Sequence, residues 1–199
     1  MSDRLENLLG ALVLAVWDSL SSAAETAAGH PGALAAGLAV LAQDPGLGIE
    51  QLKRQLGRTQ SATVRVVDQL VAEGRAERRA GHDHRSVSVV LTDRGTAAAA
   101  RVLDARSAVL REAMAVLDAG ERTVLTAMLE KVLAGITADR AHAEQICRLC
   151  DLGACPLPAC PVEGAAGPEP RPASRPQPRP IPRRYRSNDV RSSASPGGR

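Results

Sequence analysis

Residues 81–95 read GHDHRSVSVVLTDRG and predict a short basic hairpin that continues into a helix. Alternating apolar residues share one face of the second strand: Val87, Val89 and Leu91. Thr92 is placed to cap the helix that follows, with Asp93 in its first turn. At the hairpin tip, Asp83 stands two residues before Arg85 and can orient its guanidinium group. Such an arginine suits a narrow, electronegative DNA minor groove.

A helix-turn-helix pattern lies immediately upstream of this hairpin. Residues 49–56 have apolar side chains at helical spacing, and Gly57 permits a sharp turn. A second helix is predicted over residues 59–73, closed by Gly74, and a strand over residues 76–79. The order helix, turn, helix, strand, wing, strand predicts a winged helix.

The second helix has two distinct faces. Its buried stripe is expected to consist of Ala62, Val66, Val67 and Leu70. The other face has small polar residues at its N-terminal end and Arg65 farther along, which suits entry into a DNA major groove. The candidate DNA contacts are Thr59, Gln60, Ser61, Thr63, Val64 and Arg65 in the helix, and Arg78, Asp83 and Arg85 in the wing.

Positive charge is concentrated on this unit. The whole chain has a net charge of only +3, but residues 53–94 hold nine Lys and Arg against five Asp and Glu, whereas residues 1–52 hold one Arg against six acidic residues. The distribution of charge therefore indicates a nucleic-acid partner. The alternative is a solvated surface with a chance excess of positive charge.

These features together resemble the MarR (multiple antibiotic resistance regulator) family of winged-helix transcription factors. The resemblance covers roughly residues 5–138, and the residues that carry it are Ser61 to Leu70, Glu73-Gly74, Glu77-Arg78, Asp83 to Ser86 and Leu91-Thr92-x-x-Gly95. It implies a dimer that binds a palindromic DNA site, often to repress, and that often releases the DNA when a small molecule or an oxidant arrives. Val64 departs from the polar residue, commonly Thr, that many members have before the arginine, and leaves at most an apolar contact such as one to a thymine methyl.

The segments on either side of the winged helix are expected to form a homodimer. A helix is predicted to about residue 28, with a wide apolar face at Leu5, Leu8, Leu9, Leu12, Val13, Val16 and Trp17. A second is predicted over residues 92–117, with a seven-residue apolar step at Val102/Leu103, Val109/Leu110 and Val116/Leu117. A third begins at a capping box of Asp118 and Glu121, and its buried face is expected to use Val124, Leu125, Met128, Leu129, Val132, Leu133 and Ile136.

The predicted architecture is mainly helical with a small β-hairpin wing, so that a winged helix-turn-helix is inserted between dimerisation helices. The predicted units are an N-terminal dimerisation helix (1–30), the DNA-binding domain (31–94), C-terminal dimerisation helices (95–138), a Cys-rich segment (139–163) and a disordered Pro/Arg-rich tail (164–199). The tail's eight arginines against two acidic residues suit either a loose grip on phosphates or a passive solubilising role.

The apolar N-terminal segment also invites comparison with a signal peptide. A signal peptide begins with a positively charged region, whereas here Asp3 and Glu6 outweigh Arg4. No uninterrupted apolar run reaches the roughly 18 residues of a membrane span. We therefore expect an interface helix, a cytoplasmic protein and no membrane partner.

All four cysteines of the chain fall within fourteen residues, in the pattern Cys147-x2-Cys150-x4-Cys155-x4-Cys160. Thiolates at short spacings suit tetrahedral zinc or an iron–sulfur cluster. The spacing matches neither a paired-CxxC zinc ribbon nor the common ferredoxin runs. Reversible thiol–disulfide sensing, and cysteines without a defined role, remain as alternatives. His142 is a weaker candidate ligand and is more simply an exposed helix residue.

No catalytic motif is present: the sequence has no Gly-rich phosphate loop, no zinc-protease helix and no nucleophile elbow. We expect a regulator that is not an enzyme, with DNA affinity modulated by a small-molecule effector, a metal ion or the redox state. The alternative is a metal or redox protein whose Cys cluster does the chemistry while the winged helix binds another protein.

Overall fold

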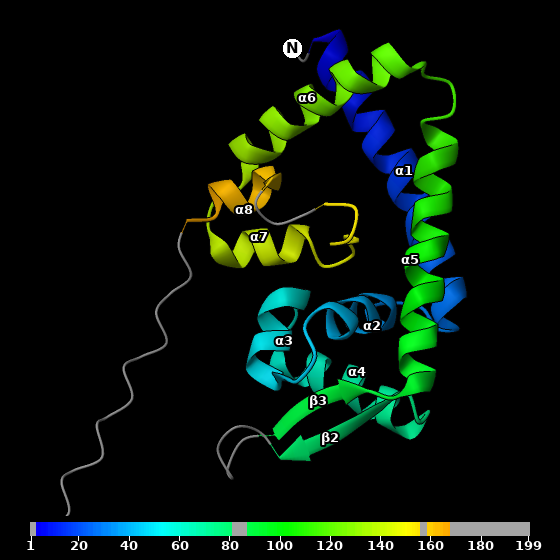
Figure 1. Ribbon diagram of the computed structural model, residues 1–199, viewed down its shortest axis with the longest axis vertical. Coiled ribbons are helices and arrows are strands. Elements are labelled where there is room, and N and C mark those ends of the chain that lie inside the picture. The colour runs from blue at the N-terminus through cyan, green and yellow to red at the C-terminus, as the bar shows by residue number, and fades with distance from the viewer. Residues whose placement is uncertain (1–2, 81–86, 156–158, 168–199) are drawn as a thin grey trace, which may run out of the picture. The chain divides into compact units, whose positions relative to one another are not determined.

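Two long helices, α1 (Arg4–Ala28) and α5 (Asp93–Ala113), pack along each other and carry a small winged domain (Figure 1). The computed structural model describes residues 3–80, 87–155 and 159–167. α1 begins at a capping box, in which Asp3 and Glu6 each accept a hydrogen bond from the other's backbone N–H, at 2.8 and 3.1 Å. It ends at Gly29, whose φ of +78° closes the last turn. The N-terminal helix therefore has the extent that was predicted.

The winged domain consists of short helices and strands: α2 (Leu34–Gln43), β1 (Leu47–Gly48), α3 (Ile49–Leu56), α4 (Gln60–Ala72), β2 (Ala76–Ala80) and β3 (Val87–Leu91). The antiparallel sheet has the order β1-β3-β2, so that Val89 pairs with Leu47 on one side and with Arg78 on the other. The helix-turn-helix prediction is confirmed at both helices, with Gly57 at φ +60° between them and Thr59 as the N-cap of α4. α2 and β1 were not predicted from the sequence.

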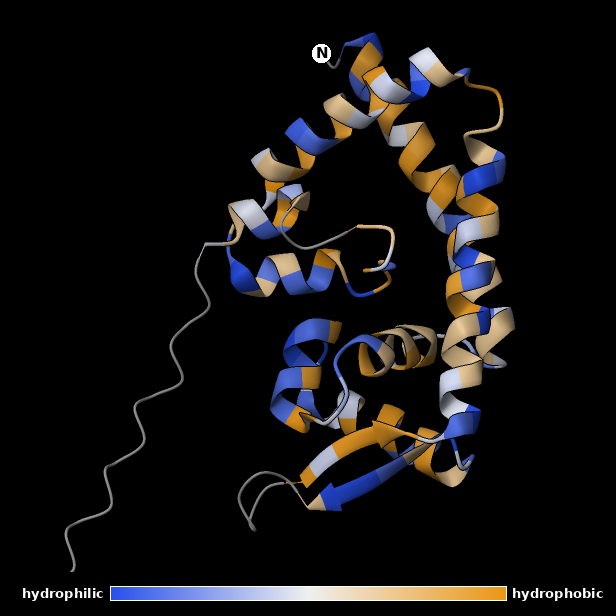
Figure 2. Cartoon of the chain, in the orientation of Figure 1, coloured by the Kyte–Doolittle hydropathy of each residue, from blue (hydrophilic) through white to orange (hydrophobic). Residues whose placement is uncertain are grey.

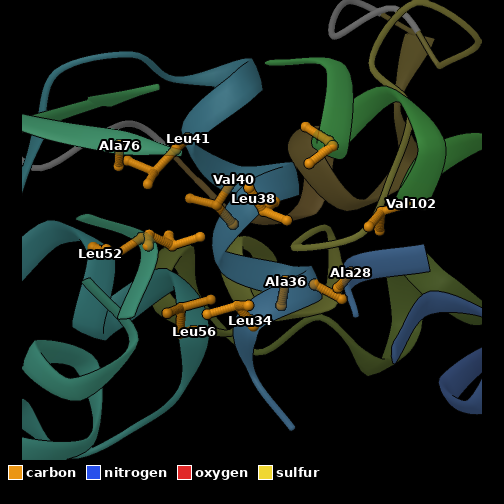
Figure 3. Packing of buried hydrophobic residues seen from close by; sticks show 14 of the residues in the cluster. Ala28, Leu34, Ala36, Leu38, Val40, Leu41, Leu52, Leu56, Ala76 and Val102 are labelled. Atoms are coloured by element: carbon orange, nitrogen blue, oxygen red, sulfur yellow. The ribbon is translucent and has the colours of Figure 1, made fainter. Parts of the chain in front are cut away.

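The core is centred on α2 and its buried members are Leu, Val and Ala, in a chain without Phe (Figure 3). Its largest fully buried side chains are Leu34, Leu38, Leu41, Leu52, Thr63, Val67, Leu70, Val89 and Val102. Small residues allow close approach: a Cβ on Gly37 of α2 would lie 2.9 Å from Cγ1 of Val66 in α4. Val67 and Leu70 are fully buried as predicted, whereas Ala62 and Val66 are only partly covered. Close packing of small side chains thus replaces aromatic bulk.

The end of β3, the end of α4 and the start of α5 meet at one closely packed junction. Thr92 caps α5 by accepting a hydrogen bond from the N–H of Gly95, while its hydroxyl donates to the carbonyl of Gly74 at 2.8 Å. The N–H of Thr92 donates to the carbonyl of Arg75 at 3.0 Å. A Cβ on Gly95 would lie 1.9 Å from that same carbonyl oxygen, so only glycine fits at this position. This contact explains the spacing Leu91-Thr92-x-x-Gly95.

The third predicted long helix is α6 (Ala119–Ile136), which begins at the predicted capping box of Asp118 and Glu121. The prediction that one of its faces is buried is wrong for the single chain, because no residue of α6 is buried. Hydrophobic residues recur along α1 and α6 (Figure 2). The large apolar side chains of these two helices with exposed fractions of 48–71% are Leu5, Leu8, Leu9, Leu12, Val13, Leu14, Trp17, Val124, Met128, Leu129, Val132 and Ile136. By length and composition alone α1 could also cross a membrane, but it packs against α5 and α2.

The end of α5 differs from its prediction. The helix stops at Ala113 and not at Leu117, so the third apolar step of the seven-residue pattern falls outside the helix. The guanidinium group of Arg122 donates to the carbonyls of Leu117 and Met114, both at 3.0 Å, and so satisfies backbone acceptors of the turn between α5 and α6. The side chain of Arg122, in the first turns of α6, therefore bonds the turn that follows α5.

The chain continues into what we call the Cys-rich extension, residues 139–155 and 159–167. It contains α7 (Arg140–Ile146), a series of turns and α8 (Pro161–Ala165). α7 contacts α3, and α8 contacts α6. Its own small core is separate from the main one and consists of Ala143, Cys160, Val162 and Ala166, with Leu133, Ile146, Cys147 and Cys155 packed against it.

We expect Gly95→Ala to destabilise the fold by about 1–3 kcal/mol, because the new methyl group overlaps the carbonyl of Arg75 and either α5 or the turn must move. Urea unfolding followed by circular dichroism measures this. Gly10→Ala in α1 is the matched control, since a Cβ there meets no atom within 4 Å and the helix should gain about 0.5–1 kcal/mol. Equal unfolding midpoints for Gly95→Ala and the wild type would contradict the role of the junction.

Candidate nucleic-acid interface

α4 presents a polar face to solvent next to the sheet. Gln60, Ser61, Arg65 and Asp68 are exposed on it, and Val64 between them is half-buried. Arg65 makes no ion pair with any other residue that the structure describes. A free guanidinium on an exposed helix face can donate to a base edge or to a phosphate.

One predicted contact on α4 is wrong. Thr63 is fully buried, and its hydroxyl donates to the carbonyl of Thr59 at 3.0 Å within the helix. It lies on the same side as Val67 and Leu70, and the polar character of threonine had suggested the exposed side. Thr59 has a structural task of its own, because its hydroxyl accepts from the N–H of Ala62 at 3.3 Å and caps α4.

The strand that leads into the wing is tied to α4. The guanidinium of Arg78 on β2 forms an ion pair with the carboxylate of Asp68 on α4. Both side chains are well exposed, so the pair itself contributes little stability. It orients the strand on the helix, and it occupies one donor of the arginine that was predicted to contact DNA. On the next residue of β2, Arg79 pairs with Glu77.

The tip of the wing lies outside the described residues, and with it the predicted contacts Asp83 and Arg85. The two strands that lead to it are paired up to their ends, with Ala80 opposite Val87. Of the alternating residues predicted for β3, Val89 is fully buried, Leu91 is partly buried against the main core and Val87 is exposed.

Arg75 belongs to the basic segment in sequence but has an internal role. Its side chain is 14% exposed, and it donates to the carbonyl of Ala28 at the end of α1. Glu73 pairs with it at 3.0 Å and with His30 at 2.8 Å. The excess of basic residues counted over 53–94 therefore overstates the positive charge available to a ligand.

A cavity of about 310 Å³ lies beside the first helix of the helix-turn-helix. It is bounded by α1, α2, the end of α3 and residues 145–149 of the Cys-rich extension. Arg58, Arg148 and Glu25 line it together with Trp17 and Leu56. Arg58, in the turn between α3 and α4, was not among the predicted site residues, because nothing in the sequence around it indicates a cavity.

The Cys-rich extension is seated on the winged domain by polar contacts. Glu144 of α7 accepts two hydrogen bonds from Arg54 of α3, at 2.6 and 3.0 Å. Gln43 at the end of α2 donates to the carbonyl of Cys150 at 2.6 Å. The guanidinium of Arg148 lies 5.8 Å from the ring centre of Trp17 in α1. The helices α1, α2 and α3 thus all contact this one short segment.

The four thiols are free and fall into two pairs. Cys147 and Cys150 share a side-chain hydrogen bond, as do Cys155 and Cys160. The hydrogen bond with Cys147, together with the charge of Arg106, lowers the pKa of Cys150 to about 6, and the same bond raises the pKa of Cys147. Burial and the bond with Cys160 raise the pKa of Cys155.

His142 takes no part in this cluster. Its ring Nδ1 accepts a hydrogen bond from the N–H of Ala138 at 3.2 Å, at the start of α7. Within residues 3–80, 87–155 and 159–167, no three His, Cys, Asp or Glu side chains are placed to hold a metal ion.

Comparison with known proteins identifies the family. No protein-family sequence model and no curated protein matches this chain. A MarR family transcriptional regulator from Silicibacter pomeroyi is 30% identical, with a TM-score of 0.53 over 66% of this chain and 92% of that one. The MarR family protein Rv2887 of Mycobacterium tuberculosis is similar in its complex with DNA (26% identical, TM-score 0.54, 66% of this chain and 98% of that one). It is also similar in its complex with salicylic acid (29% identical, TM-score 0.52, 66% and 97%).

These relatives are regulators and not enzymes, and nearly their whole length is matched. The structure has the same order of parts that the resemblance implied, a winged helix-turn-helix between α1 and the pair α5 and α6. The chain therefore belongs to the MarR family of transcriptional regulators.

Proposed function

We propose that this regulator is a cytoplasmic homodimer that represses transcription by binding palindromic double-stranded DNA, and that a small effector releases it. The observation that carries the proposal is the exposed face of α4, on which Arg65 has no ion-pair partner among the described residues. The pair of Arg78 with Asp68 supports it further, because it aligns the base of the wing with α4.

In this proposal α4 enters the major groove and the wing lies along the neighbouring minor groove. The exposed residues Gln60, Ser61 and Arg65 would then meet base edges and phosphates. Arg85 at the wing tip, oriented by Asp83, would enter the minor groove. Two copies of α4 would lie about 34–36 Å apart, one turn of DNA, which requires a palindromic site. A dimer seated across a promoter would block transcription, as is common in the family.

The exposed apolar faces of α1 and α6 support a homodimer. On α6, Val124, Met128, Val132 and Ile136 follow each other at four-residue steps and are 51–60% exposed. A run of this kind on a single chain marks an interaction surface. A second copy of the chain is the natural occupant, since a symmetric dimer also supplies the two α4 helices that a palindrome needs.

The cavity between α1, α2, α3 and the Cys-rich extension supports an effector site. Its volume of about 310 Å³ is at the lower end of small-molecule sites, and its lining combines Trp17 with two arginines. A MarR family relative forms a complex with salicylic acid. An effector bound here would act by favouring one position of α3, and hence α4, relative to α1.

We expect Arg65→Ala to weaken DNA binding by about 1–3 kcal/mol, since it removes a groove contact without touching the core. The measurement is fluorescence anisotropy with a duplex selected by the wild-type protein from random-sequence DNA, over a series of salt concentrations.

Arg111→Ala, near the end of α5, removes the same charge far from α4 and is the control. Its affinity should stay close to that of the wild type, and both variants should unfold at the wild-type temperature. If the two variants bind the selected duplex equally well, α4 is not the recognition helix.

We expect Met128→Glu to shift the protein from dimer to monomer, because a carboxylate would be buried in the proposed interface without a partner. Sedimentation velocity over a range of concentrations measures the change. Thr126→Glu places the same charge on the other side of α6 and should leave the dimer intact. An unchanged dimer in Met128→Glu would show that this face of α6 has another role.

A further inference from the structure

The Cys-rich extension connects α6 to α3 through contacts at its two ends (Figure 1). α8 packs against α6, and Leu133 of α6 joins the small core of the extension. At the other end α7 contacts α3, where Glu144 accepts two hydrogen bonds from Arg54. The side chain of Gln145 lies on the turn of the helix-turn-helix, because a Cβ on Gly57 would be 3.2 Å from its Cδ. The extension therefore touches the turn that leads into α4.

This seating makes the extension one wall of the cavity of about 310 Å³. Gln145, Arg148 and Leu149 line the cavity from the extension, and Gly57 and Arg58 line it from the turn between α3 and α4. The three residues of the extension follow residue 138, where the resemblance to the MarR family ends. The wall is therefore an addition to the part of the chain that resembles the family.

The charged groups of the cavity favour an anion. Arg58 and Arg148 line it, and neither forms an ion pair with a residue that the structure describes. Arg148 uses one donor on the carbonyl of Gln145, at 2.5 Å, and its guanidinium has further donors. Among the described residues of the lining, Glu25 is the only acid, and its carboxylate accepts a hydrogen bond from the N–H of Gly32. Two guanidinium groups are thus placed to bind a carboxylate.

A buried hydroxyl group belongs to the same lining. The side-chain oxygen of Ser21 on α1 is buried and has no hydrogen-bond partner among the described residues. Because a buried hydroxyl without a partner is costly, a ligand oxygen that reaches it gains affinity. Trp17, Leu56 and Leu149 supply apolar surface for the rest of a ligand. The lining therefore combines positive charge, a hydroxyl group and apolar side chains.

We propose that the cavity binds a small aromatic carboxylate, and that Arg148 of the Cys-rich extension, Arg58 and Ser21 all bond to its carboxylate group. Arg148 rests on the ring of Trp17, with 5.8 Å between the guanidinium carbon and the ring centre, so it is oriented before a ligand arrives. The bound ligand connects the extension to the turn between α3 and α4. The class of effector and the role of the extension rest on the effector site of the proposed function, whereas ligand binding is measured without DNA.

The first experiment is calorimetric titration of the full-length protein with 1-naphthoate, and with 1-naphthamide as a neutral probe of the same shape. We expect one 1-naphthoate per chain and an affinity for 1-naphthamide lower by a factor of about ten or more, because the amide has no charge for the two arginines. Equal affinities, or no binding of 1-naphthoate to the folded wild type, would overturn the carboxylate site. Either result would leave the DNA-binding role standing, because Arg65→Ala tests that role separately.

Variants of the two arginines test where the carboxylate binds. Arg148→Ala and Arg58→Ala should each weaken binding of 1-naphthoate by a factor of about ten or more, and should change the affinity for 1-naphthamide much less. Arg106→Ala is the matched control, since Arg106 lines a neighbouring cavity of about 160 Å³ and not this one. If only Arg148→Ala binds 1-naphthoate as tightly as the wild type, the extension does not contribute to the site.

Ser21→Ala tests the buried hydroxyl group. It should weaken binding of 1-naphthoate by a factor of about five, because one hydrogen bond to the carboxylate is lost. The free variant should unfold at or above the wild-type temperature, since the change removes a buried group without a partner. Wild-type affinity in Ser21→Ala would show that this hydroxyl does not bond to the ligand.

Hydrogen exchange tests whether the ligand holds the extension in place. Saturating 1-naphthoate should slow amide exchange in residues 140–150 and in α3, because the ligand contacts both walls of the cavity. In Arg148→Ala at saturation, the added protection of residues 140–150 should be lost. Protection of α1 and α2 in the wild type, without any change in residues 140–150, would show that the ligand binds without holding the extension.

Discussion

The close contact of Gly95 with the carbonyl of Arg75 determines where the long helices leave the winged domain. Thr92 bonds next to the end of α4 and the start of β2, so α4, the base of the wing and α5 share one anchor. Because α5 packs along α1, a shift between these long helices must move α4 and the wing together. The long helices and α4 are therefore joined without a flexible link.

The absence of Phe shapes the rest of the molecule. Alanine, glycine and leucine let α2 approach its neighbours closely, as Gly37 against Val66 shows, but they bury little area per residue. The apolar surface that the single chain does not bury remains on α1 and α6. The small core of the Cys-rich extension is likewise made mostly of small side chains, with cysteine and alanine at most of its positions.

Much of the fold could be predicted from the sequence, because local rules act where the chain is periodic and well capped. The bounds of α3 and α4, the cap at Thr92 and the capping box at Asp118 all follow from such rules. The rest depends on contacts that leave no recognisable pattern in the sequence. α2 is apolar on every side and has no periodicity to detect, and α5 stops four residues early because Arg122, farther along the chain, binds the turn after it. Thr63 was misplaced because a hydroxyl that bonds within its own helix can be buried. A count of charged residues likewise cannot show that Arg75 bonds to the backbone at the end of α1 and is not available to a ligand.

Trp17 is the only tryptophan of the chain, and it stands where three parts of the molecule meet. Its ring lies under Arg148 of the Cys-rich extension and lines the cavity beside Leu56 of α3. Indole emission is sensitive to a neighbouring cation and to water, so the protein contains an optical probe at this one place. The emission of Trp17 would therefore change if the contact with Arg148 were lost, and also if a ligand entered the cavity. Both changes could be measured in the unlabelled wild-type chain.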